Sequence, residues 1–399
     1  LGYTEWTLKN GIKVVVRPST LKADEVIIYA TAKGGKSMLS DADYFHGDYL
    51  AMVMQQSGIS KFSATELAKQ LSGKSAHASV GVGAYEHAVN ASGSPKDIET
   101  ILQLMYLNFT APRFDETDLQ NLKNMYVPYF RNMEADPGYL MGKAFQETLY
   151  QNHVRRQATS AAQIESLNLE TLASVHKQLF SYADDFRFVI AGNVDLKTLK
   201  PLVEKYIGSL PVSKKLSKKV DDGARTVKGE VVNDFKVKMQ QPKVGLTRIY
   251  TGPIDYTLKN RVAMNVLSQV LRSRYTISIR EEKGGTYSVG VGGRVMADYE
   301  PWYQLIVLFD TNEQMADELS QIVIDEIKKI ATEGPNAEDV EKTRKYLLKE
   351  YENQIQSNNN WLDWLDEHNY RGVDFAAEYK KAVEALTYDD LKALAAKIL

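Results

Sequence analysis

The stretch DIETILQLMYLNFTAPRFDETDLQNLKNMY, residues 97–126, decides the fold, because its pattern returns as MADELSQIVIDEIKKIATEGPNAEDVEKTRKYL at residues 315–347. Both stretches have the spacing of two amphipathic helices with acidic starts, joined by a short turn. Pro112 in the first turn corresponds to Pro335 in the second. A pattern that recurs after about 200 residues indicates duplicated domains, since solenoid repeats recur every ~20–50 residues.

A second pair of matching segments supports the duplication. SLNLETLASVHKQL at residues 166–179 resembles ALTYDDLKALAAKI at residues 385–398, and each copy also begins with strands followed by a helix. Strands and helices grouped in this way are typical of an α+β fold. We therefore predict two homologous domains, residues 1–212 and 231–399, each a mainly antiparallel sheet with helices packed on it.

The segment between the two copies and the end of the second copy carry further information. Residues 213–230, SKKLSKKVDDGARTVKGE, are polar, charge-rich and without periodicity, which predicts an exposed linker. In the first copy the strand DDFRFVIAG follows the helix at 166–179, whereas the second copy ends at Leu399 before any such strand. We expect the second domain to lack its last strand, and a chain that starts at Leu1 fits an origin in a longer polypeptide.

The composition excludes several classes of protein. The chain has 49 Lys and Arg residues against 51 Asp and Glu residues, a formal charge of −2, so no nucleic-acid partner is expected. Cysteine is absent, which excludes disulfide bonds and thiolate metal sites. No apolar run approaches the ~18–20 residues of a membrane span. Apolar residues make up 44% of the chain, as in globular proteins with a sizeable core.

Three segments carry a resemblance to a known family. They are WTLKNGIKVVVRP at 6–18, FSATELAKQLSGK at 62–74 and IREEKGGTYSVGV at 279–291. Together with the order of the elements, they resemble the pitrilysin family of zinc metallopeptidases, which includes insulin-degrading enzyme and the mitochondrial processing peptidase. The resemblance covers essentially the whole chain. It implies an enzyme built from two similar halves that enclose a chamber for peptides, with zinc in one half only.

The resemblance also indicates which half this chain represents. The zinc half carries an HxxEH motif on the first helix of its first domain, where two histidines bind the metal and the glutamate activates water. The corresponding helix here, GDYLAMVMQQSG at 47–58, places Tyr49, Met52 and Val53 at those positions. None of these side chains can replace an imidazole or a carboxylate. The resemblance therefore implies no metal site in this chain and zinc in a complementary N-terminal half.

Two other segments end in Glu-His, as the inverted motif does. GAYEH ends at His87 and WLDEH ends at His368, but Gly83 and Trp364 stand where the first histidine would be. GAYEH also lies in an alternating strand, whose spacing does not bring ligands to one metal as a helix does. We interpret both as surface Glu-His pairs. If a metal does bind, His46, His87 and His368 are the first candidate ligands.

Arg280 and Tyr287 are the candidate catalytic residues. In the non-zinc half of the family, an arginine and a tyrosine with this spacing follow a helix in the last domain and point at the other half's active site. The resemblance implies that they stabilise negative charge on the peptide carbonyl oxygen or hold the substrate backbone. Gly284 and Gly285 would allow a tight turn, and with Ser288 they are predicted to bind substrate. The spacing alone has little weight, because the chain has 23 tyrosines.

These features together predict the C-terminal, non-catalytic half of a zinc-dependent peptidase, which encloses peptide substrates and is inactive alone. Its partner would be the N-terminal zinc-bearing half of the same polypeptide or a separate active subunit. Two alternatives stay open: a separate zinc-less subunit that acts as a partner or structural component, and a stand-alone peptide-binding module. A homodimer is a further expectation. Among locations, the bacterial periplasm or cell envelope is favoured over the cytoplasm.

Overall fold

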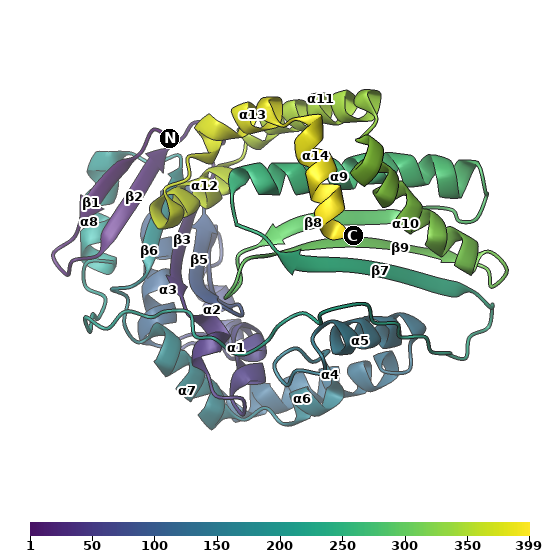
Figure 1. The fold of residues 1–399 in the computed structure, drawn as a ribbon. Helices are drawn as coiled ribbons and strands as arrows, with labels where there is room; N and C mark the ends of the chain where they lie inside the picture. Colours follow the sequence, from purple (N-terminus) through teal and green to yellow (C-terminus); the bar gives the residue numbers. More distant parts are fainter. The chain divides into compact units, whose positions relative to one another are not determined.

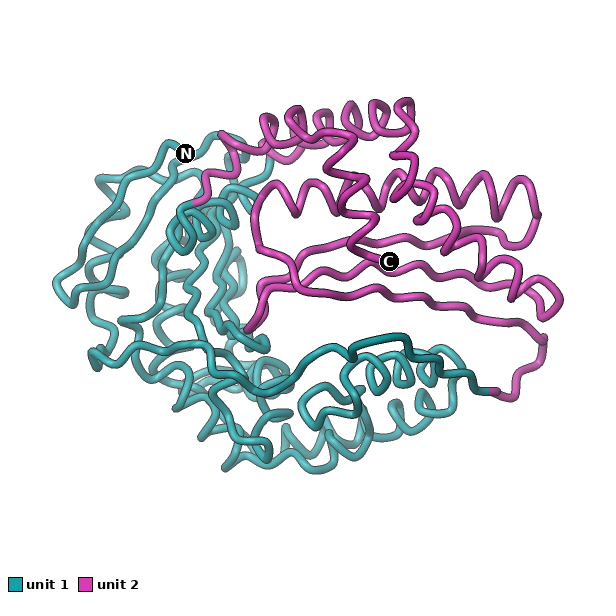
Figure 2. The backbone as a smooth tube through the Cα atoms, in the orientation of Figure 1, with its two compact units in different colours: residues 1–235, 357–372 teal, residues 236–356, 373–399 magenta.

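The chain folds into two compact units, which the computed structural model describes over residues 1–399 (Figures 1 and 2). The first unit contains residues 1–235 and 357–372, and the second contains residues 236–356 and 373–399. Each unit has one sheet, and all strand pairs except one are antiparallel, so the predicted α+β class is confirmed. That the two units are homologous domains with the predicted ranges stays a prediction.

The sheet of the first unit has six strands in the order β1-β2-β6-β3-β5-β4, with β2 and β6 forming the one parallel pair. The hairpin of β1 and β2 closes at Gly11, whose φ of 88° suits glycine. Its neighbour Asn10 donates a side-chain hydrogen bond to the carbonyl oxygen of Ile207 at 2.9 Å. The strands are β1 (Thr4–Thr7), β2 (Lys13–Pro18), β3 (Val26–Lys33), β4 (Ala76–Val82), β5 (Glu86–Gly93) and β6 (Arg187–Gly192).

The main core of the first unit lies between one face of this sheet and a layer of helices. Val14, Val16 and Ile28 are fully buried in it. Most of these helices begin at a residue whose side chain accepts a backbone N–H, as Asp195 does from Thr198 at 3.0 Å. The helices are η1 (Gly35–Met38), α1 (Tyr44–Ser57), α2 (Ala64–Gln70), η2 (Pro95–Asp97), α3 (Ile98–Thr110), α4 (Glu116–Met133), α5 (Pro137–Leu149), α6 (Ala161–Glu165), α7 (Leu169–Phe180) and α8 (Leu196–Tyr206).

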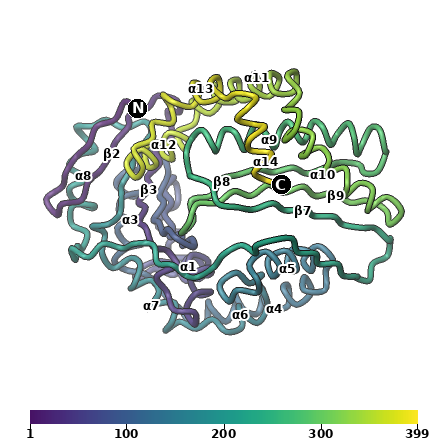
Figure 3. The backbone as a smooth tube through the Cα atoms, in the orientation of Figure 1, coloured from purple at the N-terminus to yellow at the C-terminus, as the bar shows by residue number.

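Helix α12 (Asn358–Arg371) covers the opposite face of the same sheet, although it comes from far along the chain (Figure 3). Val15 and Ile27, which alternate with the core residues of β2 and β3, form a second apolar cluster with Leu362 and Leu365. Neighbouring residues of a strand point to opposite faces, so a strand that is apolar at every position needs cover on both. The helix supplies this cover.

A polar network fixes α12 on the sheet. The Asp366 carboxylate accepts hydrogen bonds from Nε and Nη2 of Arg187 at 3.0 and 3.1 Å. The hydroxyl of Thr31 donates to the same carboxylate at 2.8 Å. At the start of the helix, the Asn358 amide donates to Glu25 at 3.0 Å. Two parallel bonds from one guanidinium give geometric specificity as well as energy, so this network sets the position of the helix.

The second unit contains a three-stranded antiparallel sheet in the order β7-β9-β8, so β7 and β8 are its edge strands. Helix α9 packs closely on β8, where a Cβ on Gly293 would lie 2.9 Å from the carbonyl oxygen of Met264. The elements are β7 (Val244–Pro253), α9 (Leu258–Tyr275), η3 (Thr276–Glu281), β8 (Gly290–Met296), β9 (Trp302–Thr311), α10 (Ala316–Glu333), α11 (Ala337–Gln354), α13 (Phe375–Ala385) and α14 (Tyr388–Ile398).

The packing of α12 is testable by substitution of Leu362, which is fully buried. Leu362→Ala should weaken the attachment of the helix by about 2–5 kcal/mol, because apolar contacts are lost and a cavity remains. Hydrogen exchange of residues 358–371 should accelerate accordingly. Leu216→Ala is the matched control, since Leu216 lies in the same unit but is 75% exposed. Equal exchange of α12 in both variants would contradict this assignment of the second core.

Candidate functional site

The turn between α9 and β8 contains the predicted catalytic pair. Helix α9 does not stop at Tyr275 but widens into the π-helical segment η3. Within it, the amide of Glu282 donates to the carbonyl oxygen of Ile277, five residues back, at 2.9 Å. Single π-helical turns are rare and occur frequently at functional sites. The buried hydroxyl of Tyr275 donates to the carbonyl oxygen of Val323 in α10 at 2.8 Å, which anchors the helix where it widens.

Gly284 and Gly285 close this helix and start the turn. The amide of Gly284 donates to the carbonyl oxygen of Arg280, and that of Gly285 to the carbonyl oxygen of Ile279, both at 3.0 Å. Gly284 has a φ of 62°, in the left-handed region where helices commonly end in glycine. Gly285 is buried against α10, where a Cβ would lie 2.4 Å from Leu319 Cδ1. Glycine is thus favoured at both positions, at 284 by the backbone conformation and at 285 by the close contact with Leu319.

The turn brings Arg280 and Tyr287 together on the surface of the second unit. The guanidinium carbon of Arg280 lies 5.8 Å from the centroid of the Tyr287 ring, at the outer range of a cation–π contact. Arg280 is exposed and Tyr287 is 88% exposed, which is unusual for an aromatic side chain. Ser288 is exposed beside them, just before β8 begins at Gly290. The five predicted residues therefore lie close along the chain, Arg280 near the end of η3 and the other four in the turn that follows, where Gly285 is buried.

The residues predicted to match the zinc motif lie on α1 of the first unit, and their side chains do not fit a zinc ion. Val53 is fully buried, and the Tyr49 hydroxyl donates to Gln163 at 3.2 Å. Burial raises the pKa of Tyr49 to about 12, so the phenol stays protonated. Met52 is 38% exposed and lines an open pocket of about 420 Å³ with Met125 and other residues of α1 and α4. A phenol, a thioether and an isopropyl group are not a zinc ligand set.

The three candidate histidines lie on separate elements, α1, β5 and α12, and are not part of any group of metal-ligating side chains. The interpretation of His87 as a surface residue is wrong, because strand alternation turns it inward and it is only 1% exposed. Its ring lies edge-on to Phe180 and Phe186, and its Nδ1 accepts the Gly35 amide at 3.2 Å. Burial lowers the pKa of His87 to about 4, so it is neutral near pH 7.

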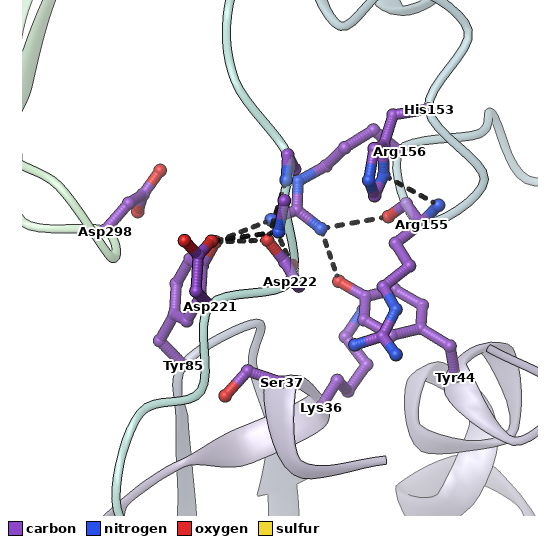
Figure 4. Close-up of polar contacts among 12 residues, drawn as sticks. Lys36, Ser37, Tyr44, Tyr85, His153, Arg155, Arg156, Asp221, Asp222 and Asp298 are labelled. Atoms are coloured by element: carbon purple, nitrogen blue, oxygen red, sulfur yellow. Dashed lines mark hydrogen bonds and ion pairs between the residues drawn. The ribbon is translucent and has the colours of Figure 1, made fainter. Parts of the chain in front are cut away.

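A polar network holds segment 213–230 against the rest of the first unit (Figure 4). This network was not predicted from the sequence. The segment is mostly exposed and forms no helix or strand, but the Asp222 carboxylate is fully buried. It accepts hydrogen bonds from Arg156 and from the Tyr85 hydroxyl, both at 2.8 Å. Burial opposes ionisation, yet the Tyr85, Ala224 and Arg156 contacts lower the pKa of Asp222. No local pattern marks this pairing, because its two charged residues lie 66 positions apart.

Comparisons with known proteins agree with this description. A family model described as "Peptidase M16 inactive domain" matches residues 166–347. The "Zinc protease PQQL-like" protein of Arabidopsis thaliana is 22% identical over 380 residues, which cover 91% of this chain and 37% of that protein. The chain thus spans about a third of the length of the curated relatives it matches. The resemblance to the pitrilysin family of zinc proteases is confirmed.

Solved structures show the same fold. The periplasmic protease PqqL from Escherichia coli matches with a TM-score of 0.83 at 18% identity, over 100% of this chain and 44% of that chain. The first half of the same protease matches with a TM-score of 0.75 at 13% identity, over 100% of this chain and 89% of that chain. The fold of this chain therefore resembles the first half of that protease and also a portion of the complete protease.

The buried neutral His87 predicts a pH dependence of stability. Its pKa is about 4 in the folded chain against 6.5 as the ordinary value, so the unfolded chain binds the proton more readily. The free energy of unfolding is therefore highest above about pH 6.5. It decreases as the pH falls toward 4, by about 3 kcal/mol in total. We expect the free energy of unfolding, measured with urea, to differ less between about pH 7.5 and pH 5 in His87→Gln than in the native chain. If exposed His77→Gln has the same effect, His87 is not the cause.

Proposed function

Because this chain carries the inactive domain of the M16 zinc peptidases, we propose that it is the C-terminal, non-catalytic half of a zinc-dependent peptidase. In this role it encloses peptide substrates and supplies Arg280 and Tyr287 to a zinc site in the N-terminal half. The observation that carries the proposal is the exposed Tyr287 ring beside Arg280, at the tip of a turn whose base is buried. A free phenol and a free guanidinium are available there to another molecule.

The chemistry of these two groups fits peptide hydrolysis. Attack on a peptide carbonyl builds negative charge on its oxygen, and fixed donors aimed at that oxygen stabilise the transition state. The Tyr287 hydroxyl would donate one hydrogen bond there. The Arg280 guanidinium, which is always charged, would hold the developing charge or a carbonyl oxygen of the substrate backbone. Neither group needs to move a proton in this role.

The strand that follows the turn is suited to hold an extended peptide. β8 is an edge strand, so one of its sides is not paired within the sheet. An extended peptide can add to such an edge through main-chain hydrogen bonds. Ser288 lies between the catalytic pair and β8, where it can contact the peptide as the chain passes from one to the other. Gly290 and Gly292 keep the start of the strand free of bulky side chains.

The relatives support a partner and a location for this protein. This chain matches about a third of their length, and the first half of PqqL has a similar fold, so the zinc-bearing partner would be such a half. The E. coli relative is described as a periplasmic protease, and we propose the periplasm or cell envelope for this protein too. None of its helices combines the length and the apolar character that a membrane span requires.

Tyr287→Phe tests the catalytic role in the intact enzyme. Loss of one hydrogen-bond donor to the transition state should lower kcat by about 10²-fold while KM changes little. The fold should not change, because the ring stays and the hydroxyl is exposed. Tyr346→Phe is the matched control, since Tyr346 is an exposed tyrosine of the same unit on α11. Unchanged turnover of Tyr287→Phe would remove Tyr287 from the mechanism.

Zinc content tests the division of labour between the halves. The purified chain, dialysed against a trace of free zinc, should retain less than about a tenth of an equivalent, because a stable site needs three or four protein ligands. It should also fail to cleave peptides. One firm equivalent of zinc would contradict the proposal, and substitution of His46 and His368 would then show where the metal binds.

A further inference from the structure

The base of the Tyr287 turn makes two contacts with other elements of the second unit. Thr311, the last residue of β9, donates its hydroxyl hydrogen to the carbonyl oxygen of Gly285 at 2.6 Å. Leu319, in the first turn of α10, fills the space where a side chain at position 285 would be. Thr311 and Leu319 are both buried, so neither contact is shared with solvent. Gly285 is thus held by a hydrogen bond from Thr311 and by an apolar contact with Leu319.

The outer part of the turn has weaker support. Lys283 pairs with Glu318 at 2.5 Å, but both side chains are about half exposed, and exposed ion pairs contribute little. The hydroxyl of Thr286 donates to the carbonyl oxygen of Ser288 at 3.2 Å, a contact internal to the turn. The ring of Tyr287 interacts with the guanidinium of Arg280. Tyr287 is therefore held through its neighbours in the chain, of which Gly285, two residues earlier, and Val289, two residues later, are buried.

We propose that Thr311 is a positioning residue, which sets the place of Tyr287 by holding the carbonyl oxygen of Gly285. If the Thr311 hydroxyl is removed, this carbonyl loses its side-chain donor in a buried place, and the turn shifts toward water to replace it. Catalytic groups misplaced by about 1 Å can lower turnover by up to about 10²-fold. The effect on turnover rests on the proposed function, whereas the effect on the turn does not.

A spin label tests the effect on the turn in the chain itself. The chain has no cysteine, so Ser288→Cys provides a single site for a nitroxide. Thr311→Val keeps the shape of the side chain and removes the hydroxyl, and it should make the label more mobile. Thr311→Ser keeps the donor and should restore the native spectrum. An unchanged spectrum in Thr311→Val overturns the proposal.

Two controls separate positioning from general loss of stability. Thr343→Val removes a buried hydroxyl of the same unit, which donates to Asp339 at 2.8 Å within α11, and it should leave the label unchanged. Gly285→Ala should mobilise the label, because its Cβ would collide with Leu319, whereas Gly245→Ala has room, with no neighbour nearer than 3.5 Å. A label that responds to Thr343→Val as strongly as to Thr311→Val also overturns the proposal.

Kinetics of the intact enzyme distinguish the positioning role from the proposed function. Thr311→Val should lower kcat by about 10-fold or more, with less change in KM. The same substitution should add nothing when Tyr287→Phe is already present, because both act through one hydroxyl. If Tyr287→Phe lowers turnover and the two effects are fully additive, the positioning role is overturned. If the label responds as expected but Tyr287→Phe leaves turnover unchanged, the positioning role stands and the proposed function fails.

Discussion

The need to cover both faces of the six-stranded sheet is the constraint on which the first unit depends. Val14 and Val16 face one core while Val15 between them faces the other, so neither face can be left to water. Local helices cover the first face, and α12 covers the second. The pair of Arg187 and Asp366 then selects one placement of the helix among those that apolar contact alone would allow.

The second unit shows how an exposed side chain, the predicted catalytic Tyr287, can be held without being buried. A tyrosine that must reach another molecule cannot be fixed by packing of its own ring. Here Gly285 is the residue that is held. The π-helical segment η3 connects it to Tyr275, which is buried and hydrogen-bonded to α10. The exposed side chain of Tyr287 is thus separate from the contacts of Gly285 that position it. Functional side chains are usually supported by other residues in this way.

The helix α1 shows the opposite outcome. Two of the three positions predicted to match the zinc motif, Tyr49 and Val53, are buried and belong to the packing of the first unit. Met52 and Met125 line an open pocket together with Gln55 and Gln56. His87 lies in the same unit, edge-on to the rings of Phe180 and Phe186, and its burial keeps it neutral near pH 7. Tyr49, Val53 and His87 are thus part of the buried interior of this unit.

The sequence by itself determined the α+β class, the repeat of elements and the spacing of Arg280 and Tyr287, because these depend on periodicity and on residues close along the chain. The tertiary structure decided which distant residues meet. Neither the return of α12 to the first sheet nor the hydrogen bond from Thr311 to Gly285 leaves a local pattern. His87 was misjudged for the same reason: alternation turns it inward, but the rings that bury it, Phe180 and Phe186, lie far along the chain.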